Sequence, residues 1–168
     1  MISPAFCRMM ARYNAWQNAG YITATAKMDD TALREDRGAF FGSIFATLNH
    51  LLWGDAMWMS RFDGGERPDG GIAESTRMTA TPALWRGARK RMDQRITEWT
   101  RHLREVDLAG DLHWVSGALG REVSRPMSLC VAHFFNHQTH HRGQVHAMMG
   151  QAGISLPDTD IFVMETTG

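Results

Sequence analysis

Two histidines occupy the apolar side of a long amphipathic helix near the end of the chain. This segment, residues 126–152, reads PMSLCVAHFFNHQTHHRGQVHAMMGQA. A helix turns by about 100° per residue, so His137 and His141 share one narrow side with Met127, Cys130, Phe134, Val145, Met148 and Ala152. The spacing of four residues places the two rings about 6 Å apart along the axis, where both can reach one point.

This pair predicts a metal site. An imidazole that is buried without a partner costs about 1–3 kcal/mol, and one bound cation would satisfy both rings. Two alternatives stay open: the rings are hydrogen-bonded core residues, or the helix is turned so that they face water. A lone histidine favours such an alternative, whereas a spaced pair inside an apolar stripe favours the metal.

A third histidine, His50, lies in the segment GAFFGSIFATLNHLLWGDAMWMSRF. Small residues surround it on the same helix face, namely Ala46, Thr47 and Gly54, and they would leave room for an ion and its waters. On its own, His50 is better explained as a hydrogen-bonded core residue. It becomes a candidate ligand because of the pair on the last helix.

The composition limits the class of protein. The 168 residues fit a single domain, 1–168. The 18 basic residues balance 18 acidic ones, which gives no overall field for nucleic acid or anionic lipid. Cys7 and Cys130 form neither a CxxC motif nor a disulfide framework, and no stretch reaches transmembrane length. We therefore expect a cytoplasmic protein with a small-molecule substrate and with neither nucleic acid nor membrane as a partner.

Periodicity predicts an all-α fold with four helices, at about 4–27, 40–61, 82–104 and 126–150. Residues 29–38 are predicted to be a polar connection, and 111–125 a β-hairpin before the last helix. The glycine-rich segment 62–80 is too long for a tight turn, so it predicts a crossover between two parallel helices. A lid over a site is the weaker alternative for this segment.

The second helix is apolar nearly all the way round, so it needs two packing partners. We predict that its His50 face looks into the bundle. The opposite face would pack on another subunit or a covering segment, through Phe41, Ile44, Phe45, Leu48, Leu52 and Met59. Arginines of the third helix, Arg89 among them, are assigned to a solvated face because acidic residues are interleaved with them.

One histidine from the second helix and two from the fourth would make a three-nitrogen site with open positions, as in catalytic metal centres. Imidazole ligands suit zinc, nickel, iron or copper better than calcium or magnesium. Asn136 and Gln144 are candidates to orient a ligand ring, and Arg125 is a candidate for contact with an anionic substrate. Cys130 is about 10.5 Å of helix rise from His137, too far for easy co-ligation.

Several segments together resemble one known family, the DinB/YfiT-like metalloenzymes. They are YNAWQN (13–18), GSIFATLNHLLWGD (42–55), GREVSRP (120–126), NHQTHHRGQVHAMM (136–149) and PDTDIFVM (157–164). The resemblance implies an up-down-down-up four-helix bundle, usually a homodimer, with a divalent metal such as nickel, zinc, iron or manganese. The family's three histidine ligands correspond here to His50, His137 and His141.

The resemblance also suggests a reaction. Relatives in the wider superfamily include thiol-dependent S-transferases and a maleylpyruvate isomerase, which use mycothiol, bacillithiol or glutathione. The first hypothesis is therefore metal-dependent transfer of a low-molecular-weight thiol to an electrophile, in detoxification or stress response. Two alternatives stay open: a metal-dependent hydrolase, for which the sequence offers no convincing general base, and a metal-binding stress protein without turnover.

Overall fold

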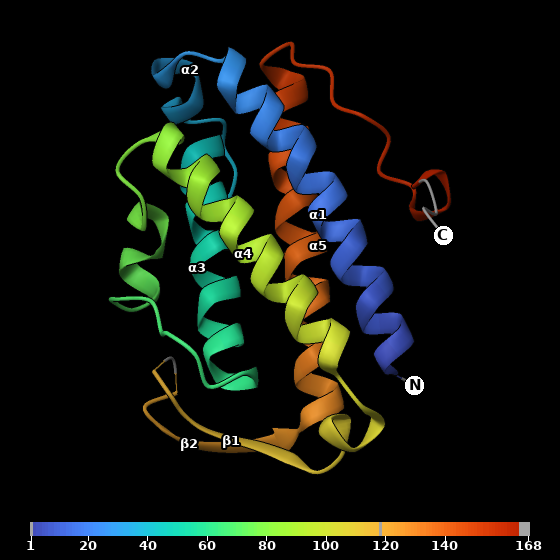
Figure 1. Cartoon of the computed structure of the whole chain (residues 1–168). Coiled ribbons are helices and arrows are strands. Elements are labelled where there is room, and N and C mark those ends of the chain that lie inside the picture. The colour runs from blue at the N-terminus through green and yellow to red at the C-terminus, as the bar shows by residue number, and fades with distance from the viewer. Residues whose placement is uncertain (1, 118, 165–168) are drawn as a thin grey trace.

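Four long helices form the body of the protein in the computed structural model, which describes residues 2–117 and 119–164. They are α1 (Pro4–Lys27), α3 (Ile44–Phe62), α4 (Pro82–His102) and α5 (Met127–Gln151). Figure 1 shows α1 and α5 running in one direction and α3 and α4 in the other. The predicted up-down-down-up bundle is therefore confirmed. No helix in these two ranges is both long and apolar enough to span a membrane.

Side-chain caps fix the starts of three of these helices. The side chains of Ser3, Ser43 and Thr81 accept hydrogen bonds from backbone N–H groups in the first turns of α1, α3 and α4. Pro4 and Pro82 follow two of these caps, where a missing N–H costs nothing. The predicted start of the second helix at residue 40 was wrong, because Gly42 takes a φ of 76° in a turn that precedes the cap.

The connections agree with the prediction except in one place. Residues 63–81, with the 3-10 helix η1 (Ile72–Arg77), run back along α3 and so make α3 and α4 parallel (Figure 1). The predicted polar connection 29–38 instead contains a short helix, α2 (Asp30–Arg34). Asp29 caps it by accepting from the Ala32 N–H at 2.7 Å.

A two-stranded antiparallel hairpin closes one end of the bundle, as predicted. It consists of β1 (Asp111–Ser116) and β2 (Arg121–Pro126), with Trp114 opposite Val123, and the short η2 (Glu105–Leu108) precedes it. After α5 the chain returns along α1 and ends in η3 (Ile161–Val163). There the Tyr13 hydroxyl donates to the Thr159 carbonyl at 2.6 Å.

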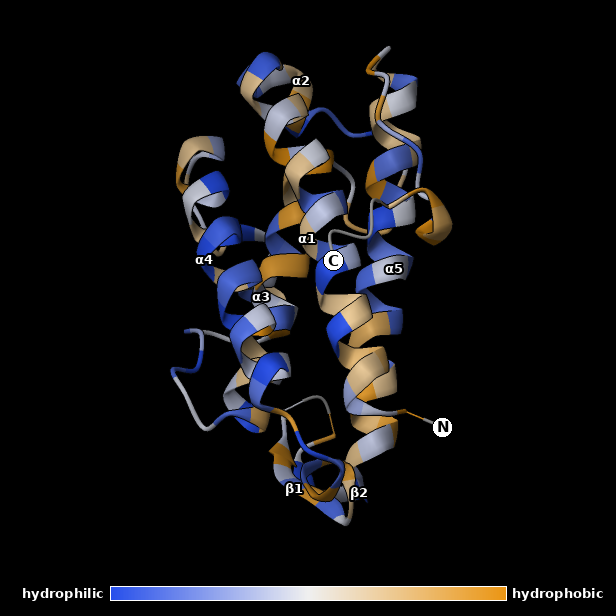
Figure 2. Cartoon of the chain, turned by 45° about the vertical axis from the view of Figure 1, so that its right-hand side comes forward, coloured by the Kyte–Doolittle hydropathy of each residue, from blue (hydrophilic) through white to orange (hydrophobic). Residues whose placement is uncertain are grey.

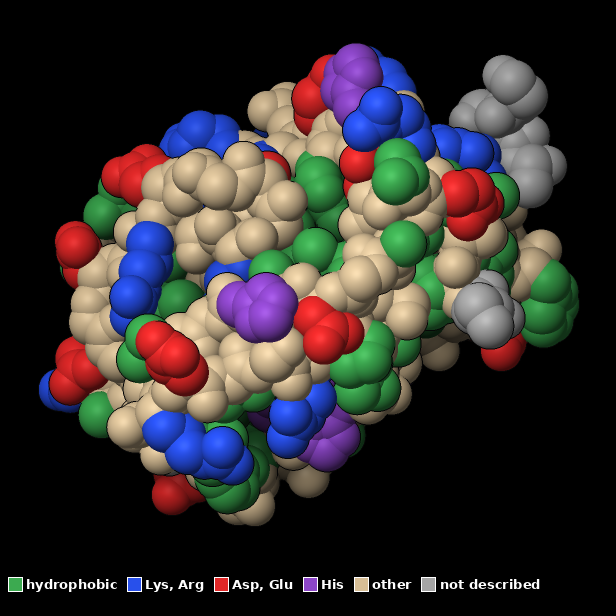
Figure 3. All heavy atoms as spheres, turned by 90° about the horizontal axis from the view of Figure 1, so that it is seen from below, with side chains coloured by type: hydrophobic (Ala, Val, Ile, Leu, Met, Phe, Trp, Pro, Cys, Tyr) green, Lys and Arg blue, Asp and Glu red, His purple; other side chains and the backbone are tan. Residues whose placement is uncertain are grey.

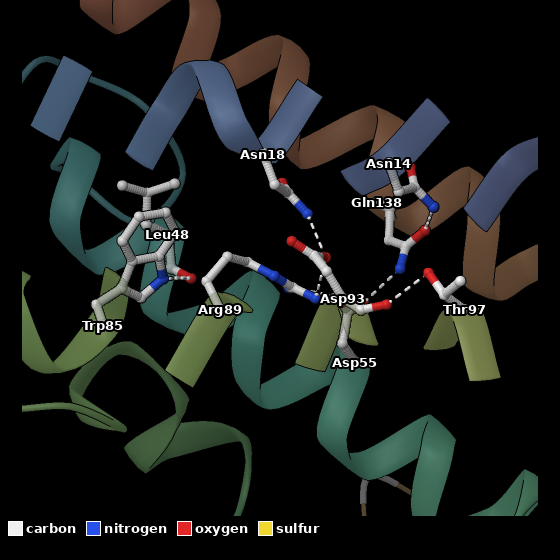
Figure 4. Close-up of polar contacts among 9 residues, drawn as sticks. All are labelled: Asn14, Asn18, Leu48, Asp55, Trp85, Arg89, Asp93, Thr97 and Gln138. Carbon is white, nitrogen blue, oxygen red and sulfur yellow. Dashed lines mark hydrogen bonds and ion pairs between the residues drawn. The ribbon is translucent and has the colours of Figure 1, made fainter. Parts of the chain in front are cut away.

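The interior of the bundle contains a polar network as well as apolar side chains (Figure 4). Arg89 of α4 pairs with Asp55 of α3 at 2.6 Å and with Asp93 at 2.8 Å. Gln138 of α5 donates to Asp55 at 2.9 Å, and Asn14 of α1 donates to Gln138. We name these five residues the interior network. It connects all four long helices.

The interior network corrects two predictions. Figure 2 shows α4 as a mostly hydrophilic helix, yet Arg89 is only 2% exposed, so its assignment to a solvated face was wrong. The face of α3 that looks into the bundle carries Asp55 and Leu48, whose carbonyl accepts from the Trp85 indole. Leu48 and Leu52 are therefore covered within this chain. The His50 face points instead toward a groove beside the bundle. Periodicity could not identify the inner face of a helix that is apolar all round.

Candidate metal centre

The structure brings His50, His137 and His141 together between α3 and α5. Each offers one ring nitrogen to a group whose members lie within 4.8 Å of one another. The Nε2 atoms of His50 and His137 are 3.2 Å apart, and the His137 and His141 ring centroids are 4.5 Å apart. The spacing of four residues on α5 produces the second contact, and the packing of α3 on α5 brings in His50.

Hydrogen bonds fix the proton position on two of the three rings. The hydroxyl of Ser75 donates to the Ile72 carbonyl at 2.7 Å, so it accepts from Nδ1 of His50, 2.9 Å away. Likewise Nδ1 of His141 donates to the Gln144 side-chain oxygen at 2.8 Å. In each ring the Nε2 lone pair is then directed toward the group, as metal ligation requires.

The ring of His137 packs against α3 at Gly54. A Cβ at Gly54 would lie 2.9 Å from Cε1 of His137, so only glycine leaves room for the ring against α3. The buried Nδ1 of His137 has no hydrogen-bond partner within the described part of the chain. Its Nε2, by contrast, belongs to the group.

All three rings are held in the neutral form that binds metals. Burial, with a smaller contribution from His141, lowers the pKa of His50 to about 4. Burial also lowers the pKa of His137 to about 3, and the neighbouring histidines add to that effect. Burial lowers the pKa of His141 as well. At neutral pH no proton therefore competes for these lone pairs.

The donor set fits a divalent transition metal. Two imidazole nitrogens bound tetrahedrally at 2.0–2.1 Å are about 3.3 Å apart, and the observed 3.2 Å separation matches this value. In the described residues the group comprises three histidines without a carboxylate or thiolate. Three neutral nitrogens leave at least one position for another ligand, as in catalytic sites.

The three rings open on a cavity of about 740 Å³. The 63–81 connection forms part of its wall, so this crossover also covers the site. Phe41 stacks against His50 with ring centroids 4.1 Å apart. The remaining wall is rich in aromatic and basic side chains, including Trp53, Trp58, Arg61, Arg67, Trp114 and His133. A volume of this size is typical of small-molecule sites.

The sequence also suggested Gln144, Asn136 and Arg125 as site residues, and the structure places them differently relative to the histidines. Gln144 accepts from Nδ1 of His141, and its role in orienting a metal ligand stays a prediction. Asn136 is exposed on α5 and makes no hydrogen bond to a histidine within the described ranges. Arg125 is exposed, does not line the cavity and donates to the Ser124 carbonyl. Cys130 is buried, as expected for a core residue.

Sequence reasoning missed several residues around the site. Ser75 reaches His50 from a connection, and no periodicity identifies such a contact. The prediction that Phe41 lies on the face opposite His50 was wrong, because Phe41 precedes α3 and its ring lies against His50. Trp114 comes from the hairpin, whose docking on the bundle the sequence does not specify. Arg61 could have been predicted as a site residue from the sequence, because it lies eleven residues after His50 on the same helix, near the C-terminal end of that helix.

Comparison with known proteins identifies the family. A family model described as the DinB family matches residues 1–167. The chain therefore belongs to the DinB family. Protein DinB of Bacillus subtilis (strain 168) is 22% identical over 156 residues, which cover 92% of this chain and 91% of that protein.

Two solved structures share the DinB-family fold. A DinB-like protein from Bacillus cereus ATCC 10987 matches with a TM-score of 0.62 at 17% identity, covering 85% of this chain and 90% of the other. YfiT from Bacillus subtilis matches with a TM-score of 0.65 at 16% identity, covering 92% of both chains. YfiT is described as a probable metal-dependent hydrolase with an unusual four-helix bundle topology. At these identities the likeness establishes the fold alone.

Proposed function

We propose that this DinB-family protein is a metal-dependent enzyme that transfers a low-molecular-weight thiol to an electrophilic small molecule. One observation carries the proposal: one ring nitrogen from each of three histidines lies within 4.8 Å of the others, on the wall of a cavity large enough for such a substrate. His50, His137 and His141 would hold nickel, zinc, iron or manganese. Such an ion would supply Lewis acidity, which favours the thiolate form of a bound thiol.

The residues around the histidines would prepare the site. Ser75 and Gln144 hold two rings in the required tautomer. Phe41 covers the outer side of His50, which limits access of water to the histidines. The aromatic wall would bind the apolar body of an electrophile. In the reaction the thiol would release its S–H proton to solvent, and its sulfur would form a bond to an electrophilic carbon as the bond from that carbon to the leaving group breaks. The leaving group takes the electrons of the broken bond; in an epoxide it is the ring oxygen, which then takes up a proton.

Hydrolysis is the second candidate, since YfiT is described as a probable metal-dependent hydrolase. A hydrolase needs a group that takes a proton from the attacking water. Glu74 is the carboxylate found among the described cavity residues, and its Oε2 already accepts the Gly71 N–H at 2.8 Å. Thiol transfer is placed first because a thiol ionises more readily than water and so demands less of a base. A metal-binding stress protein without turnover is the remaining alternative.

The test compares metal-loaded wild type with a folded His137→Ala variant. Each would be offered glutathione, bacillithiol or mycothiol with a panel of aromatic halides and epoxides, and ester and amide substrates without a thiol. Mass spectrometry would detect the products. We expect thioether products from wild type alone. Ester or amide cleavage without thiol dependence would establish the hydrolase, and a loaded protein without any product would favour the binding protein. The homodimer and the cytoplasmic location stay predictions.

A further inference from the structure

Two arginines of the cavity wall have no acidic partner. Arg61 at the end of α3 and Arg67 in the following connection both line the cavity that contains the histidines. Neither forms an ion pair with a carboxylate anywhere in the described chain, although Arg34, Arg37, Arg89, Arg95, Arg101 and Arg104 all do. On the end of the molecule that carries the hairpin, acidic and basic side chains are interspersed (Figure 3). Other arginines are also unpaired in the described part of the chain, but Arg61 and Arg67 are the two found in the wall of this cavity.

Arg61 is held in place by aromatic rings. Its guanidinium carbon lies 4.5 Å from the ring centre of Trp58 and 5.2 Å from that of Trp114. Stacking on indoles orients the planar guanidinium and leaves its N–H groups at the ring edges to donate. Burial and the positive charge of Arg67 lower the pKa of Arg61. Glu74 also lines the cavity, but its Oε2 accepts the Gly71 N–H and it forms no ion pair with either arginine in the described part of the chain.

The distance between Arg61 and the three histidines limits the shape of a ligand that contacts both. His50 and Arg61 are separated by about 16 Å of helix axis. Between them, His133 and Trp58 line the wall, with ring centroids 5.1 Å apart. A molecule that contacts both ends must be elongated, with an apolar or aromatic middle and an anionic end. A carboxylate matches the paired N–H groups of a guanidinium.

We propose that Arg61, with Arg67 beside it, binds the carboxylate of an elongated substrate whose reacting atom lies at the three histidines. This inference rests on the proposed function for the reaction but not for the binding itself. It names a specificity-determining pair and a substrate class, small carboxylic acids. The carboxylate belongs either to a peptide-like thiol or to an aromatic electrophile.

Binding of unreactive probes tests the proposal by calorimetry on the full chain. One pair is S-methylglutathione and its diethyl ester, and the other is 4-phenylbutyrate and its methyl ester. We expect at least one acid to bind wild type about tenfold to a hundredfold more tightly than its ester. The acid that binds identifies the source of the carboxylate. Equal affinity of acid and ester, or no binding of either acid, would overturn the proposal.

Variants assign the preference to the two arginines. Arg61→Gln should abolish the preference for the acid, and Arg61→Lys should retain part of it. Arg67→Gln changes an exposed residue and should reduce the preference for the acid even if Arg61→Gln disturbs the hairpin. The control Arg101→Gln replaces an exposed arginine that pairs with Glu98 on α4 and should leave it unchanged. A preference that survives both Arg61→Gln and Arg67→Gln would overturn the proposal.

The same titrations on His137→Ala separate this inference from the proposed function. The carboxylate site does not use the histidine group, so the preference for the acid should persist in this variant. Loss of thiol transfer with an intact preference would count against the proposed reaction alone. Normal thiol transfer without any preference for the acid would count against the arginine pair alone.

Discussion

Two polar clusters lie one residue apart on the same helices and differ in how their polar atoms are satisfied. On α3, Gly54 contacts the histidine group and Asp55 belongs to the interior network. On α5, His137 belongs to the histidine group and the next residue, Gln138, belongs to the interior network. The charges of the network are paired inside the bundle. Each histidine instead brings one ring nitrogen to within 4.8 Å of the other two. The network therefore serves the fold, and we propose that the histidine group binds a metal.

The largest expected effect is on the network. Asp55→Asn would leave the buried Arg89 with Asp93 as its one acidic partner, and we expect a loss of about 3 kcal/mol in the free energy of unfolding. Urea denaturation of metal-free protein measures it. The triple variant Asp55→Asn, Arg89→Met and Asp93→Asn should recover part of the loss, because it removes all three charges and leaves none of them buried without its partner. A loss below about 1 kcal/mol would show that the pair is not essential to the fold.

Gly54→Ala tests the other cluster through its closest packing contact. The added methyl group would meet the His137 ring at 2.9 Å, so the ring must move and metal affinity should fall about tenfold to a hundredfold. Competition with a chromophoric chelator gives the affinity. Gly143→Ala on α5 has open space around its Cβ; it should raise stability by about 0.5–1 kcal/mol and leave metal affinity unchanged. Equal affinities of both variants would contradict the packing account.

Gln144→Ala removes the hydrogen bond that orients His141. We expect about a tenfold loss of metal affinity and little change in unfolding, because Gln144 is only partly buried. Asn136→Ala, one turn before His140 on the same helix and exposed, is the matched control. If the two variants lose affinity equally, general helix polarity and not the His141 contact is responsible.

A further effect concerns pH. In metal-free protein the unfolded histidines have a pKa near 6.5, whereas folded His50 and His137 have values of about 4 and 3. Below pH 6.5 the unfolded state binds more protons, so the free energy of unfolding should fall as the pH is lowered from 6.5 toward 4. Urea titrations at several pH values should show a shallower fall in His137→Ala. An identical fall would mean that His137 is accessible to protons when folded.

The sequence predicted most of the fold because caps, periodicity and the length of the 62–80 segment act locally. It named His137, His141 and Gln144 as candidates because their spacings on α5 are helical, whereas His50, on α3, became a candidate only through that pair and the family resemblance. It did not predict which side of α3 faces the bundle, since apolar residues surround that helix and the charged Asp55 was not expected inside. Ser75, Phe41 and Trp114 were beyond reach because they approach the site from connections and a hairpin, whose docking depends on tertiary packing.

The central claim is that the three histidines hold one metal ion, and metal content tests it most directly. Untagged wild type and folded His50→Ala, His137→Ala and His141→Ala variants would be analysed by elemental mass spectrometry. His140→Ala, at an exposed position on α5, would serve as the control. We expect close to one equivalent of a transition metal in wild type and His140→Ala, and its loss in the other three. Wild type that stays empty after exposure to nickel, zinc, iron and manganese would contradict the account.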